Sequence, residues 1–183
     1  QRHFGENYVQ EGESKVNALK SSYPDILWHF IGPLQSNKTK IVASLFDWMH
    51  TLSRDKIAQR LNDQRPHDLV PLNVCIQINI SQEPSKSGAT ADDMLALAEF
   101  INLLPNLKLR GLMAIPTATS EVLQQQAEFK KLHHLYLKLQ QVYPDVDTLS
   151  MGMSNDLELA VEHGSTMVRI GSAIFGQRDT LNI

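Results

Sequence analysis

The chain contains 183 residues with a formal net charge of −3 and a pI of about 6.2, and 42% of its residues are hydrophobic. This length fits one domain with a sizeable core, and the scattered lysines and arginines argue against a nucleic-acid groove or an anionic membrane surface. No apolar run approaches the roughly 18 residues of a membrane span and no signal-peptide pattern opens the chain, so we expect a cytoplasmic protein that binds neither nucleic acid nor membranes.

The first third of the chain predicts two strands, each followed by a helix. Residues 3–5 resemble the end of a strand, and a helix is expected over residues 8–19 with Asn7 as its candidate N-cap. A second strand is expected over residues 26–31, before a helix that ends near Leu45. In that second strand His29 lies between Trp28 and Phe30, which face the other way. A single strand histidine is more typical of a packed core than of a catalytic site.

The middle of the chain continues this alternation. A strand over residues 47–52 precedes a helix that Ser53 is expected to cap, and residues 70–80 form the most strand-like run of the chain. Cys75 lies inside that run, where a buried small hydrophobe is the common case and a catalytic thiol is not. As the single cysteine, it also indicates a reducing compartment.

A polar loop over residues 79–88 follows this strand and is long enough to border a site, since the loops at the carboxyl ends of barrel strands carry function. Lys86 in this loop lies among Pro, Ser and Gly. A Schiff-base lysine needs partial desolvation to lower its pKa, so we do not assign that role to Lys86.

The next elements are a helix over residues 91–104 capped by Thr90, a strand over residues 107–115 and a long amphipathic helix over residues 121–142. His133 and His134 on the long helix have neither the spacing nor the nearby cysteines of a zinc site. We therefore expect no metal.

The last thirty residues carry the strongest functional pattern. A strand over residues 148–150 leads to a helix with N-cap signals at residues 154–156, and Gly164 is expected to end that helix. The following strand, residues 166–170, is apolar except for Arg169, so in a parallel barrel it would be buried on both faces. Alternation places Met167 and Arg169 on the same face, which points into the barrel if the other face meets a helix layer.

Residues 171–173 then open a short helix whose free backbone N–H groups form an anion site. Two strand-to-helix turns at the end of an alternating chain match the usual phosphate site of a (β/α)8 barrel. The alternative is that Gly171 and Ser172 only make a tight turn. Arg169 argues against this alternative, because a capping turn gives no reason to bury a cation behind it.

Five blocks of sequence, in order and over nearly the whole chain, carry a family resemblance. They are FGENYVQE (residues 4–11), WHFIGPLQSNK (28–38), INISQEPSKSG (78–88), GLMAIP (111–116) and LSMGMSNDLELAVEHGSTMVRIGSAIFG (149–176). Together they resemble the pyridoxal phosphate homeostasis proteins, the YggS/PROSC type, which are related in fold to the N-terminal barrel of alanine racemase.

This resemblance implies a single α/β domain over residues 1–183, a TIM (β/α)8 barrel that binds pyridoxal 5′-phosphate (PLP) as a lysine Schiff base. It implies a protein that holds PLP and passes it to PLP-dependent apoenzymes, acts as a monomer and catalyses no robust reaction. Arg169 is expected near the pyridine nitrogen, and Asn7, if it is not only a cap, contacts the cofactor, as does His29. The phosphate is expected at Ser150, Ser154, Gly171 and Ser172, with Met153 lining the site.

Seven strands can be counted, whereas a closed barrel of this family has eight. The first strand and helix of the family, which carry the Schiff-base lysine, have no counterpart in the sequence. We therefore expect the functional molecule to include about fifty more N-terminal residues, from one βα unit plus a lead-in. The chain as given should bind PLP weakly, through phosphate and ring contacts only.

Two other functions remain open. A PLP-dependent amino-acid racemase shares the barrel and an arginine like Arg169, but racemases of that kind also carry a β-rich domain that supplies a tyrosine base. A barrel without cofactor that serves as an interaction scaffold is the third possibility.

Overall fold

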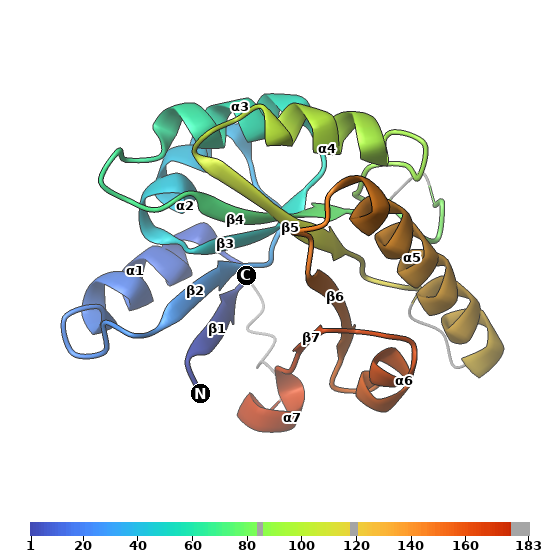
Figure 1. Ribbon diagram of the computed structural model, residues 1–183. Helices are drawn as coiled ribbons and strands as arrows, with labels where there is room; N and C mark the ends of the chain where they lie inside the picture. The colour runs from blue at the N-terminus through green and yellow to red at the C-terminus, as the bar shows by residue number, and fades with distance from the viewer. Residues whose placement is uncertain (84–85, 118–120, 177–183) are drawn as a thin grey trace.

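The computed structural model describes residues 1–83, 86–117 and 121–176. Its centre is one sheet of seven parallel strands, paired in chain order from β1 to β7, which curves into a nearly closed barrel with the helices outside it (Figure 1). The strands are β1 (His3–Glu6), β2 (Leu27–Phe30), β3 (Trp48–Leu52), β4 (Leu72–Gln77), β5 (Leu107–Met113), β6 (Thr148–Met153) and β7 (Met167–Arg169). This confirms the α/β barrel and all seven expected strands.

A helix follows each strand. The α-helices are α1 (Val9–Leu19), α2 (Thr39–Leu45), α3 (Asp55–Gln64), α4 (Met94–Asn102), α5 (Val122–Val142), α6 (Leu157–Glu162) and α7 (Ser172–Phe175), and a 3-10 turn, η1 (Ser36–Lys38), precedes α2. Among the described residues, no helix has the length and apolar character needed to cross a membrane.

Two expected helix caps are wrong. The N-cap of α1 is Tyr8 rather than Asn7, and the N-cap of α3 is Arg54 rather than Ser53, because each helix begins one residue later than the sequence signal indicates. Thr90 does accept a hydrogen bond from the Asp93 N–H at 3.1 Å. The helix that it precedes, however, begins only at Met94.

The end of α6 follows the expected pattern. Gly164 has φ +90°, its N–H donates to the Val161 carbonyl, and the Ser165 N–H donates to the Ala160 carbonyl, each at 3.0 Å. These two bonds form a Schellman motif, which satisfies the last carbonyls of a helix. The strand before α6 is longer than expected, since β6 runs on to Met153 instead of ending at Ser150.

Each strand divides its side chains between the helices and the barrel interior. The helix-facing side chains belong to one large buried cluster, which includes Phe30, Met49, Val74, Ile76, Leu112 and Leu149. A smaller buried cluster, Trp48, Cys75 and Met113, packs against Met167 inside the barrel. All three residues of β7 are only partly buried, so the expected burial of this strand on both faces is wrong. The reason is that β7 is an edge strand, with β6 as its partner in the sheet.

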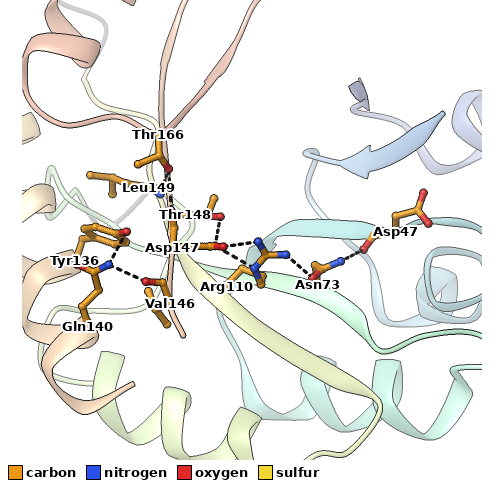
Figure 2. Close-up of polar contacts among 10 residues, drawn as sticks. All are labelled: Asp47, Asn73, Arg110, Tyr136, Gln140, Val146, Asp147, Thr148, Leu149 and Thr166. Atoms are coloured by element: carbon orange, nitrogen blue, oxygen red, sulfur yellow. Dashed lines mark hydrogen bonds and ion pairs between the residues drawn. The ribbon is translucent and has the colours of Figure 1, made fainter. Parts of the chain in front are cut away.

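A polar network connects the amino ends of the strands (Figure 2). Arg110 of β5 donates to both carboxylate oxygens of Asp147 and, at 2.8 Å, to the side-chain oxygen of Asn73 on β4. Asn73 donates in turn to the Asp47 carbonyl before β3 at 3.1 Å. The Arg110 guanidinium also lies 4.5 Å from the ring centre of Trp48. These contacts occupy the amino end of the barrel with protein groups.

Gly111 permits a bulge in β5 that changes which side chains point inward. The register between β4 and β5 shifts at this position, and a Cβ on Gly111 would lie 1.7 Å from the Thr148 carbonyl oxygen, with φ at +156°. Before the bulge Arg110 points inward, and after it Met113 does. No residue with a side chain fits this contact without moving β6.

We therefore predict that Gly111→Ala destabilises the protein by at least about 2 kcal/mol, because overlap and backbone strain add. For a chain of this size, that lowers the Tm by about 4–8 °C. Thermal unfolding followed by circular dichroism measures it. Gly171→Ala is the matched control, since no atom lies within 4 Å of its Cβ position. Equal Tm values for the two variants would contradict the role given to Gly111.

Candidate functional site

Arg169 points into the barrel at the carboxyl ends of the strands. Its neighbour two residues back, Met167, packs on the interior cluster, whereas Val168 lies 3.5 Å from the Cβ position of Gly152, on the side of α6. The expected orientation of Arg169 is thus confirmed. Its Nη1 donates to the carbonyl and the hydroxyl oxygen of Ser150 at 2.9 and 2.7 Å, and its Nη2 donates to the Ala114 carbonyl at 2.9 Å.

These bonds hold a charged donor at the mouth of the barrel. Burial lowers the pKa of Arg169 to about 10, and the nearby Asp156 opposes this shift, so the side chain remains a cation at neutral pH. A guanidinium has five N–H donors. Three are used, and among the described residues no acceptor engages the Nε–H or the second Nη2–H. Arg169 can therefore donate to a ligand without giving up its supports.

Three histidines continue the contacts of Arg169 across the barrel. Nδ1 of His50 lies 2.9 Å from the Ser150 hydroxyl, and Nε2 of His50 lies 2.9 Å from Nδ1 of His29. Nε2 of His29 lies 2.8 Å from Nδ1 of His3 on β1. The His29 ring also stacks on the indole of Trp48, with a centroid distance of 5.2 Å and an interplanar angle of 13°. His29 is thus a buried, hydrogen-bonded residue of the barrel interior.

Both inner histidines are neutral at physiological pH. Burial, and then the neighbouring His3, lower the pKa of His29 to about 3. Burial, followed by His29 and Arg169, holds the pKa of His50 well below its usual range. A neutral imidazole offers one donor and one acceptor, so each of these rings can connect two partners in a hydrogen-bonded chain.

A turn of small residues lies beside Arg169. The Ser154 hydroxyl, after β6, accepts from the Gly171 and Ala173 N–H groups at 3.4 and 3.3 Å, which brings the two strand-to-helix turns together. Gly171 is exposed, with open space at its Cβ position. Ser172 begins α7 directly after it. The expected phosphate residues Ser154, Gly171 and Ser172 therefore form one open turn.

The remaining expected site residues occupy different positions. Met153 is paired with Arg169 in the register of β6 and β7 and is 41% exposed. Ser150 is fully buried, with its hydroxyl engaged by Arg169 and His50. Asn7 is exposed after β1, and its backbone packs against Gly32 after β2.

His3 and His50 were not singled out from the sequence. The available signal was a histidine in each of three successive strands, but alternation within a strand does not say which histidines meet. That depends on register, and β2 pairs with β3 so that His29 lies opposite Trp48. The next inward residue of β3 is then His50, within reach of His29.

Other candidate groups are engaged elsewhere. Lys86 pairs with Glu83 at 2.8 Å and donates to the Thr117 hydroxyl at 3.3 Å, while residues 84–85 of its loop lie outside the described residues. Burial raises the pKa of Cys75 to about 12, which excludes a reactive thiolate at neutral pH. In the part of the chain that the structure describes, no group of three or more His, Cys, Asp and Glu side chains is placed to hold a metal ion.

Comparisons with known proteins agree with this geometry. The family model for the N-terminal domain of alanine racemase matches residues 1–179. A pyridoxal phosphate homeostasis protein of Vibrio alginolyticus is 61% identical over 178 residues, which are 96% of this chain and 76% of that protein. The one of Escherichia coli K12 is 55% identical over 180 residues, which are 98% of this chain and 77% of that protein.

Solved structures extend the comparison. PipY of Synechococcus elongatus, solved with PLP bound, superimposes with a TM-score of 0.86 at 36% identity and covers 96% of this chain and 82% of its own. Alanine racemase of Clostridium difficile superimposes with a TM-score of 0.73 at 15% identity, over 99% of this chain and 46% of the racemase. The second likeness shows the fold alone.

The neutral histidines predict a stability that falls in mild acid. The folded pKa of His29 lies below the ordinary value of 6.5, so as the pH drops the unfolded chain binds the proton first. The contribution of neutral His29 to the free energy of unfolding is complete above pH 6.5 and shrinks until the pH reaches about 3. Each histidine that stays neutral in the folded protein lowers the free energy of unfolding by about 1.4 kcal/mol for every pH unit below its pKa in the unfolded chain.

Urea unfolding at pH 7.5, 6.0 and 5.0, values chosen to span roughly the upper part of this window, measures the slope. His29→Asn should show a shallower fall of the unfolding free energy with pH than the unsubstituted protein, whatever its stability at pH 7.5. The control is His134→Asn, at an exposed position on α5, which should leave the slope unchanged. The prediction fails if His29→Asn and the unsubstituted protein have the same slope.

Proposed function

The chain belongs to the family of pyridoxal phosphate homeostasis proteins, within the wider family of alanine racemase N-terminal domains, and we propose from this premise that it binds PLP at Arg169 and serves in PLP homeostasis. Two sets of relatives support the proposal. The homeostasis proteins are 55–61% identical to this chain over nearly its full length, and PipY, which is 36% identical, has a structure with PLP bound.

The single observation that carries the assignment of the site is the unused donor capacity of Arg169. The Arg169 guanidinium is supported by oxygens of Ser150 and Ala114, and among the described residues two of its five N–H donors have no acceptor. The pyridine nitrogen of PLP, when unprotonated, accepts one hydrogen bond and can therefore pair with one of these donors. Because Arg169 remains protonated near neutral pH, it donates to that nitrogen and keeps it unprotonated.

The turn beside Arg169 fits the other end of the cofactor. A phosphate accepts hydrogen bonds from backbone N–H groups and hydroxyls, and this open turn offers the Ser172 N–H, the Ser154 O–H and, in exchange for its 3.4 Å bond to Ser154, the Gly171 N–H. We assign the phosphate to these three residues, with Met153 at the side. Ser150 acts on the ligand through Arg169, because its own hydroxyl is buried and already engaged. We also propose that His29 supports the ring end of the site and that Asn7 contacts the cofactor at the rim.

Bound PLP supplies an electron sink for chemistry at amino acids, and an arginine at its ring nitrogen makes that sink weak. The site therefore suits holding and delivery better than transamination. We propose PLP-dependent apoenzymes as recipients, a monomer as the acting form, the cytoplasm as its location and residues 1–183 as parts of one barrel domain.

PLP titration followed by visible absorption, together with an assay of alanine racemisation, tests this function. A saturable spectral change with no racemisation supports a PLP carrier. Saturable binding with racemisation would instead indicate a racemase, and the absence of binding at millimolar PLP would contradict the proposal.

Variants separate the two ends of the site when PLP is compared with pyridoxal, which lacks the phosphate. Ser154→Ala should weaken PLP binding several-fold, about 1 kcal/mol, without changing pyridoxal binding, because it removes a phosphate contact only. Arg169→Met should weaken both ligands by about ten-fold or more, since a bond from a charged donor is lost.

Lys138→Met, which removes an exposed cation on α5, is the control for net charge and should bind both ligands normally. Fluorescence titration gives the dissociation constants. Equal losses for PLP and pyridoxal in Ser154→Ala would place the phosphate elsewhere.

A further inference from the structure

One continuous chain of side-chain hydrogen bonds crosses the barrel interior. It runs from Arg169 on β7 to Ser150 on β6 at 2.7 Å, from Ser150 to His50 on β3 at 2.9 Å, from His50 to His29 on β2 at 2.9 Å, and from His29 to His3 on β1 at 2.8 Å. Five strands are linked through their inward side chains. The chain ends at the guanidinium that faces the ligand position.

The direction of these bonds follows from their first member. An arginine only donates, so the Ser150 hydroxyl oxygen is the acceptor in its bond with Arg169. The hydroxyl hydrogen then needs an acceptor of its own, because Ser150 is fully buried and a buried donor without an acceptor is disfavoured. Among the described residues, Nδ1 of His50 is the acceptor within reach. Ser150 therefore donates to His50.

Each neutral imidazole then determines which nitrogen of the next ring carries the hydrogen. His50 accepts at Nδ1, so its hydrogen is on Nε2 and is donated to Nδ1 of His29. His29 likewise carries its hydrogen on Nε2 and donates it to Nδ1 of His3. With the opposite direction, Ser150 would receive two donors and its own hydrogen would have no acceptor. The bare nitrogens of both inner rings also face the side of the Arg169 cation, which is the favourable orientation of their dipoles.

The low pKa values of His29 and His50 agree with this arrangement, since a protonated ring has two donors and would break the chain. The groups that face these rings are His3, the Trp48 ring, the Ser150 hydroxyl and the Arg169 guanidinium. None of these is an anion. A neutral pair of rings is therefore the state that the surroundings support.

We propose that His50 and His29 are positioning residues of the cofactor site, which hold the Ser150 hydroxyl as an acceptor and thereby orient the Arg169 guanidinium toward the pyridine nitrogen of PLP. The identity of the ligand rests on the proposed function, whereas the direction of the chain does not. One consequence is that the Ser150 hydrogen is directed to His50 and is not donated to the ligand.

The proton positions can be observed directly. Long-range ¹H–¹⁵N NMR spectra of the protein labelled with ¹⁵N-histidine, recorded without ligand near pH 7, distinguish the two neutral tautomers and the imidazolium form. We expect His29 and His50 to show a neutral ring with the hydrogen on Nε2. A hydrogen on Nδ1 of His50, or an imidazolium pattern for either ring, would overturn the proposal.

Substitutions test the effect on the site. In His50→Asn the amide oxygen of the new side chain takes the place of Nδ1 and still accepts from Ser150, so we expect PLP affinity within about three-fold of the unsubstituted protein. His50→Leu leaves Ser150 without that acceptor and should weaken PLP binding by about ten-fold. His134→Leu, at an exposed position of α5, should have no effect. Circular dichroism spectra identify any variant that fails to fold.

The outcomes separate this proposal from the proposed function. Equal affinities for His50→Asn and His50→Leu, in folded proteins, would show that the acceptor at Ser150 does not position Arg169. If the unsubstituted protein binds no PLP, the proposed function fails and the role of the histidines toward PLP fails with it. The hydrogen positions are still decided by the spectra alone.

Discussion

The structure depends on how a parallel barrel accommodates a cation in its interior. Arg169 projects inward from a strand that otherwise carries Met and Val, and burial lowers its pKa to about 10. A charge that loses much of its contact with water is tolerated only when hydrogen bonds replace that water. Here the replacement comes from oxygens of Ser150 and Ala114, at the carboxyl ends of β6 and β5. Because carbonyl and hydroxyl oxygens leave the positive charge uncompensated, an acceptor or a partial negative charge at the barrel mouth is favoured.

Two arginines point into the barrel, one toward each end, and their partners differ. Arg110, at the amino end, is paired with Asp147, bonded to Asn73 and packed over Trp48 (Figure 2). Like Arg169, Arg110 uses three N–H donors, but two of them bind a carboxylate and its guanidinium packs on an indole ring. Among the described residues, Arg169 donates to carbonyl and hydroxyl oxygens but to no carboxylate, and it retains free donors. The charge of Arg110 is therefore paired within the protein, whereas the charge of Arg169 is met only by neutral oxygens, which is why we propose Arg169 as the binding group.

Sequence patterns predicted the seven strands, because each is a short apolar run between turn signals, and they predicted the inward direction of Arg169, because that follows from alternation within one strand. They did not predict the burial of β7, which depends on its position at the edge of the sheet. Nor did they predict the histidine chain. His50 meets both His29 and Ser150 because of the register between strands and the curvature of the sheet (Figure 1), and no pattern within a single strand contains that information. The caps Asn7 and Ser53 were misplaced because each N-cap position is taken by the next residue, Tyr8 or Arg54, without a side-chain cap hydrogen bond, so the backbone path and not capping propensity sets the helix start.

The central claim is that Arg169 and the turn at Ser154 and Gly171 bind the two ends of one PLP molecule. A crystal structure of the protein grown with PLP tests this most directly. We expect the pyridine nitrogen within hydrogen-bond distance of the Arg169 guanidinium and the phosphate on the N–H groups of the turn. PLP bound outside the barrel, for example in the hollow between α4 and α5 beside Leu103 and Tyr143, with Arg169 free of ligand, would contradict it.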